Sequence, residues 1–142
     1  MAIIQTLTTS FKVELAQGLH NFTTGTGDVF KLALYTANAD LGASTTAYTA
    51  AGESSGTNYT AGGIVLTNIT PTFQGTTAYW SFENATFTNV TLTTNGALIY
   101  NSTNGNRSVC VLNFGVNITK TAQNLVITFP VDDATNAVMR IT

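Results

Sequence analysis

The sequence predicts an all-β protein, an antiparallel β-sandwich with jelly-roll-like organisation and one short helix near the N-terminus. Apolar residues recur with period two from residue 28 onward, as in strands with one buried face. The chain is rich in strand-forming residues, with 28 Thr among 142 residues. Turn residues separate the runs every 8–12 residues or so, a spacing typical of sandwiches and jelly rolls. No change in amino-acid composition divides the chain, so we predict a single domain over residues 1–142.

The N-terminal region predicts the one helix, over residues 10–18. Ser10 is a good N-cap, Phe11, Leu15 and Leu19 follow at spacings of four, and Gly18 is a stop signal. Residues 2–9 before it alternate partially in polarity. Two interpretations stay open for them: a strand in the chain's own sheet, or a strand added to a neighbour's open edge.

The rest of the chain predicts strands. In the first, Phe30, Leu32 and Leu34 share one face and Lys31 lies on the other. In a later one we expect Trp80 to face the core and Tyr79 to face outward. The predicted strands are 28–35, 64–70, 77–83, 85–93, 96–101, 108–114, 124–130 and 137–142.

Turn chemistry divides these strands. Asn95-Gly96 and Asn104-Gly105 both predict tight hairpin turns, because Asn and Gly accept positive φ angles. Pro71 and Pro130 fall at strand edges, where a missing N–H is tolerated. Residues 37–63 break the rhythm as a long polar loop or arm. The segment is either a surface excursion with an irregular strand near Tyr48 or an arm that orders against a neighbouring subunit.

Charge excludes several classes of protein. Only 8% of residues are charged, against roughly 25% in average domains, and the net charge is −2. A phosphate-driven nucleic-acid binder needs a basic surface, so we expect no nucleic-acid partner. No apolar run is long enough for a membrane span or a signal peptide, which predicts synthesis in the cytoplasm and no membrane partner. Cys110, the one cysteine, lies in an apolar strand and is expected to be buried and inert.

No catalytic, cofactor-binding or metal-ligating site is predicted, and we expect no enzyme activity. His20 is the only histidine and has no ligand-spaced partner. Asp132-Asp133 is the only carboxylate pair, and an Asx-type turn is its expected role. Nothing in the pattern brings Glu53 and Glu83 together.

Asn-x-Thr/Ser occurs eight times, which superficially suggests glycosylation. Residues i and i+2 share a strand face, so the motif instead marks a polar face on a half-buried strand. Asn68-Ile69-Thr70, Asn84-Ala85-Thr86 and Asn89-Val90-Thr91 fit that description. The surface coat is therefore Thr, Asn, Ser and Gly, with few Lys or Glu residues to block edge association. Uncharged polar surfaces of this kind lose water at little cost, which favours contact with other protein surfaces.

Several segments along the chain carry a resemblance to known proteins: residues 11–18 with His20 and Phe22, 30–36, 59–63, 96–101 and 110–115. Together they resemble small structural proteins of tailed bacteriophages. The resemblance covers about residues 10 to 130, and its motifs are fold-determining strands and carry no catalytic signature.

The resemblance implies a virion component, a capsid cement or decoration protein that stabilises a bacteriophage head. Its implied partners are the major capsid protein and copies of itself, commonly as a trimer at local threefold positions. A tail or fibre component is one alternative. A carbohydrate-binding β-sandwich is another, in which exposed aromatics such as Tyr79 and Tyr59 would bind the sugar.

Overall fold

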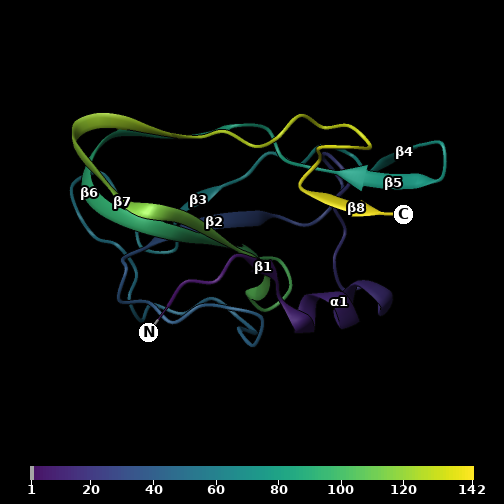
Figure 1. The fold of residues 1–142 in the computed structure, drawn as a ribbon, viewed down its shortest axis with the longest axis horizontal. Helices are drawn as coiled ribbons and strands as arrows, with labels where there is room; N and C mark the ends of the chain where they lie inside the picture. The colour runs from purple at the N-terminus through teal and green to yellow at the C-terminus, as the bar shows by residue number, and fades with distance from the viewer. Residues whose placement is uncertain (1) are drawn as a thin grey trace.

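The fold is all-β with one short helix, as the sequence predicts, in a computed structural model that describes residues 2–142. Strands of two antiparallel sheets build it: five strands in the order β1-β7-β6-β2-β3 and three in the order β4-β5-β8. Figure 1 shows the small sheet at one end of the molecule and the helix on the side opposite the loop that follows β7. The elements are β1 Thr6–Leu7, α1 Thr9–Ala16, β2 Phe30–Tyr35, β3 Ile64–Val65, β4 Thr72–Gln74, β5 Thr77–Trp80, β6 Ala85–Asn101, β7 Arg107–Ile127 and β8 Met139–Ile141.

A long β6–β7 hairpin dominates the architecture. Its turn lies at residues 102–106, where Gly105 and Asn106 both have positive φ, so the prediction at Asn104-Gly105 is confirmed. The hairpin bends along its length, and Figure 1 shows its second half returning over the first. Register shifts mark the bend, one of them between Thr94 and Gly96. Bulges increase local twist and redirect a strand, so they account for the bend of this hairpin within the five-stranded sheet.

The prediction of a turn at Asn95-Gly96 is wrong, because both residues lie inside β6. Gly96 pairs with Asn113 on one side and with Tyr35 on the other. A Cβ on Gly96 would lie 2.5 Å from the Leu112 carbonyl oxygen and 2.9 Å from Ile3 Cγ2. Glycine is needed here for close backbone approach at a bulge. The predicted strands 85–93 and 96–101 are therefore one strand, as are 108–114 and 124–130.

The helix begins and ends slightly earlier than predicted. Thr8, with extended backbone, precedes it, and its N–H donates to the Val109 carbonyl oxygen. Phe11 is buried as expected, but the second buried position is Glu14 and not Leu15. Gly18, with φ of 73°, ends the segment. Of residues 2–9 only Thr6–Leu7 joins the chain's own sheet, where β1 pairs with two residues of β7, and Ile3 forms an isolated bridge with Leu41.

Two hydrophobic clusters lie on opposite faces of the five-stranded sheet. Phe30, Leu32 and Leu34 enter the larger one, as predicted, together with the aromatic side chains of the N-terminal region and the small sheet. Ala33 and Tyr35 enter the smaller cluster on the other face. Segment 37–63 covers that second face: its Leu41 is 2% exposed and Tyr48 packs there. The segment is thus a surface layer of its own chain.

The alternation of apolar and polar residues predicts the short strands less well than the long ones. Of the predicted strand 64–70 only Ile64–Val65 forms a strand, with an isolated bridge between Asn68 and Phe82, and β4 was not predicted at all. Pro71 and Pro130 lie just outside β4 and β7, as expected. Trp80 is 6% exposed and faces the core, while Tyr79 on the other face is half-buried.

Candidate functional site: an uncharged groove at an open sheet edge

The outer edge of β7 is mostly unpaired. β1 covers Cys110 and Val111, and within residues 2–142 no strand pairs with that edge farther along. Side chains satisfy two of the next N–H groups: Gln5 Oε1 accepts from Asn113 at 3.1 Å, and Asn113 Oδ1 accepts from Gly115 at 2.8 Å. From Val116 onward β7 carries one charged side chain, Lys120. Long edges with so little charge are open to another strand or surface.

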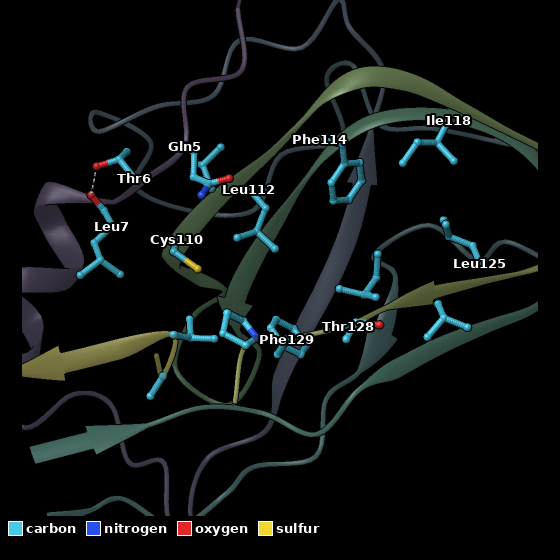
Figure 2. A pocket seen from close by; sticks show the side chains of 16 residues that line it. Gln5, Thr6, Leu7, Cys110, Leu112, Phe114, Ile118, Leu125, Thr128 and Phe129 are labelled. Carbon is cyan, nitrogen blue, oxygen red and sulfur yellow. Dashed lines mark hydrogen bonds between the residues drawn. The ribbon is translucent and has the colours of Figure 1, made fainter. Parts of the chain in front are cut away.

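A groove of about 530 Å³ opens along this edge, between the two halves of β7. Leu112, Phe114 and Ile118 line one side and are only partly buried, so the main core reaches the surface here. Figure 2 shows Leu112, Phe114 and Phe129 around an open centre. The end of β7 from Leu125 to Ile127, together with residues 128–130, Ala137 and Val138 of the connection to β8, forms another wall.

The groove is uncharged. Among the described residues that line it there is no carboxylate, amine or guanidinium, and its polar side chains are Gln5, Thr6 and Thr128. Cys110 also lines it, and burial raises the pKa of its thiol to about 12, so the sulfur is neutral at physiological pH. The arrangement suits apolar side chains and extended backbone, because a charged group placed here would lose its water without finding a partner.

The ionisable groups that the sequence singles out are held in networks elsewhere. His20 is 8% exposed, and its Nε2 donates to Glu14 Oε1 at 3.0 Å. Asn101 Nδ2 donates to His20 Nδ1 at 3.1 Å and to Asp28 Oδ2 at 2.8 Å. Arg107 donates to the second Glu14 oxygen at 2.9 Å. This network ties α1 to the hairpin turn.

Glu53 forms a second network within segment 37–63. Its carboxylate accepts from Tyr48 Oη at 2.6 Å, Tyr59 Oη at 2.7 Å and the Gly62 N–H at 2.7 Å. Burial, and then the hydrogen bond to Glu53, raises the pKa of Tyr48 to about 12. Burial also raises the pKa of Tyr59. The network fixes the layer that covers the second face of the sheet.

The remaining candidates are dispersed. Asp133 Oδ1 accepts from the N–H groups of Thr135 and Asn136, which confirms the Asx-type turn. The Asn136 side chain and then these backbone bonds lower the pKa of Asp133, while burial raises that of Asp132. Glu83 is exposed and apart from the Glu53 network.

The polar-face interpretation of Asn-x-Thr fits two of its three examples. Ala85 and Val90 are buried between exposed Asn and Thr neighbours in β6. Asn68-Ile69-Thr70 lies outside the strands.

Within residues 2–142 no three His, Cys, Asp or Glu side chains gather as a metal site would require. No helix in that range has the length and apolar character needed to cross a membrane. Comparisons with protein-family models, with curated proteins and with solved structures found no match to this chain.

Proposed function

We propose that this chain is a structural virion protein, a cement or decoration protein that binds the major capsid protein and copies of itself on a bacteriophage head. The observation that carries the proposal is the uncharged groove beside the open edge of β7. Together they offer apolar contacts and backbone hydrogen bonds along one surface, which is the chemistry of protein–protein contact.

A low-charge coat supports the same function. The molecule carries 12 charged residues among 142, and several are tied into the Glu14 network. Such a surface gives little protection against association when the protein is alone. A head offers many equivalent positions, and repeated weak contacts then hold firmly through multivalency.

The carbohydrate-binding alternative loses one of its aromatic candidates. Tyr59 packs against Phe87, and its hydroxyl donates to Glu53 and accepts from the Leu34 N–H at 2.9 Å. Its ring and hydroxyl thus both contact other residues of the same chain. Tyr79 is half-buried on the small sheet.

Localisation on intact particles tests the proposal. We expect cryo-electron microscopy or immunogold labelling of virions of the encoding phage to place this chain on the outside of the head. Purified protein added to expanded heads that lack it should bind and raise their resistance to heat. Density on the tail alone would support the tail alternative and overturn the head assignment. Absence from virions would overturn a structural role altogether.

A further inference from the structure

An apolar row extends from the core onto the small sheet, where nothing in the described chain covers it. Phe73 pairs with Ala78, and Ala78 pairs with Ile141, so the three side chains lie across one face. Trp80 and Met139 lie on that same face two residues away and are buried. Phe73 is nevertheless 73% exposed and Ile141 54% exposed. We call Phe73, Ala78 and Ile141 the Phe73 row.

The Phe73 row is as uncharged as the groove. Strands β4 and β5 and their turn, residues 72–80, contain no charged residue. Arg140 and Tyr79 pair with each other on the opposite face of the sheet. An aromatic side chain exposed on an uncharged hairpin is a typical interface anchor, because its burial removes a large apolar area from water.

The chain does not fill its own groove with this row. Phe73 is not among the groove-lining residues, and pairing of β5 with β8 holds the hairpin in place. The groove suits uncharged apolar groups and disfavours charged ones. The β4–β5 hairpin presents an apolar side chain, Phe73, with no charged residue beside it. The volume of about 530 Å³ is of the size that holds a phenylalanine ring with its neighbours.

We propose that the Phe73 row of one copy docks in the β7 groove of a second copy. The inference deepens the proposed function by naming the surfaces through which copies associate, and it rests on that function only for its setting. Row and groove are different surfaces, so the contact closes either reciprocally as a dimer or head to tail as a ring. Ala137 and Val138 line the groove and directly precede β8, so within each copy the groove wall leads into the strand that carries Ile141.

A single contact of this kind is weak. One aromatic anchor buries about 150–250 Å², far below the roughly 1,600 Å² of a standard interface. We therefore expect association of the free protein with a dissociation constant of about micromolar or weaker, strengthened where copies are held side by side.

Paired variants test the contact by sedimentation velocity and native mass spectrometry. Phe73→Ser removes the anchor, and Val126→Lys puts a charge in the groove at a side chain that is already 50% exposed. Each variant should associate at least about tenfold more weakly than the parent chain. The controls Val65→Ser and Val13→Lys change exposed apolar residues outside the row, the groove and the open edge of β7, and should associate normally.

Mixing the two variants gives the decisive result. Phe73→Ser retains an intact groove and Val126→Lys retains an intact row, so an equimolar mixture should form a one-to-one dimer although neither associates alone. A chain carrying both changes should bind neither partner. A mixture that stays monomeric, unimpaired association of Phe73→Ser, or a strictly monomeric parent chain would each overturn the inference.

A spectroscopic measurement covers the case in which the groove variant fails to fold. Phe73→Trp places an indole at an exposed position, and its emission should shift to shorter wavelength as protein concentration rises. Emission that does not change with concentration would contradict docking of the row. A monomer that still binds heads overturns this inference alone, whereas association without binding to heads overturns the proposed function alone.

Discussion

At the scale of single residues, Glu14 is an acidic side chain used where the helical pattern calls for an apolar one. It is 7% exposed, and its two oxygens serve His20 and Arg107. The helical spacing of apolar residues predicts Leu15 as the buried position instead. That spacing contains no information about ion pairs with residues far along the chain. The residues of this network were visible in the sequence, but their convergence depends on the turn at 102–106.

We expect Glu14→Ala to lower the free energy of unfolding by about 1–3 kcal/mol, because His20 Nε2 then loses its acceptor in a buried site. The contribution from Arg107 is the smaller part, since that side chain is 44% exposed. Urea unfolding followed by circular dichroism measures the change. Lys12→Ala, on the exposed side of the same helix, is the control and should change stability by less than about 0.5 kcal/mol. Equal stability of the two variants would contradict a supporting role for Glu14.

The tyrosines around Glu53 predict sensitivity to alkaline pH. Burial raises the pKa of Tyr48 to about 12 and also raises the pKa values of Tyr35, Tyr59 and Tyr100. A phenol whose pKa is higher in the folded state favours folding below its unfolded pKa of about 10. That stability is then lost as pH rises through the pKa of the folded state. We therefore expect the denaturant concentration at the unfolding midpoint to decrease as the pH is raised from about 10 to 12.

Tyrosinate absorbance and denaturant titration at several pH values measure this loss. In Glu53→Gln, removal of the neighbouring negative charge should bring the apparent pKa of Tyr48 closer to its ordinary value. The exposed Glu83→Gln is the matched control and should leave the titration unchanged. Constant stability across this alkaline range would contradict the prediction.

At the scale of elements, the β6–β7 hairpin shows both the success and the failure of turn signals. Asn104-Gly105 and Asn95-Gly96 look alike in sequence, yet only the first closes a turn. The two Asn-Gly pairs differ because Ile3 and Leu112 pack closely around Gly96. That packing is a tertiary contact, which the local sequence does not reveal. The middle of β7 was missed for a related reason. Residues 119–124 are almost entirely exposed, so no buried face imposes an alternating pattern.

Gly96→Ala should therefore destabilise the protein by about 1–3 kcal/mol, because the new methyl group meets backbone and Ile3 at the bend. Thermal and urea unfolding measure the effect. Gly42→Ala provides the control: its φ is not positive and its added Cβ would meet only Ile4 Cβ, at 3.8 Å. The two substitutions should differ by at least about 1 kcal/mol, and equal stabilities would show that the bend tolerates a side chain.

At the scale of the whole molecule, the fold class was readable from the sequence but the groove was not. Period, composition and the Asn104-Gly105 turn indicated an antiparallel all-β protein. The groove draws on residues 5–7, 110–112, 114, 118, 125–130, 137 and 138, and it exists because the hairpin bends and β1 is short. Sequence patterns identify strands but do not state which edge stays unpaired, so the candidate surface needed three-dimensional structure.

The absence of charge from both docking surfaces predicts association that salt hardly affects. Screening weakens contacts between charges and leaves apolar burial intact. We expect the dissociation constant for self-association to change by less than about threefold between ~0.05 and ~0.5 M NaCl. Sedimentation equilibrium across that range measures it. A steep loss of association with salt would indicate that charged groups such as Lys120 carry the contact.

The distance in sequence between β1 and its partner strand has a consequence for the order of events during synthesis. Leu7 pairs with Cys110, and Thr8 bonds to Ser108 and Val109. Contacts across about a hundred residues form only after that length of chain has emerged, and such distant pairing is slow. Val138, which lines the groove, emerges later still. A nascent chain on the ribosome therefore displays no groove to its neighbours on the same messenger RNA, so the proposed docking of copies waits until the molecule has folded.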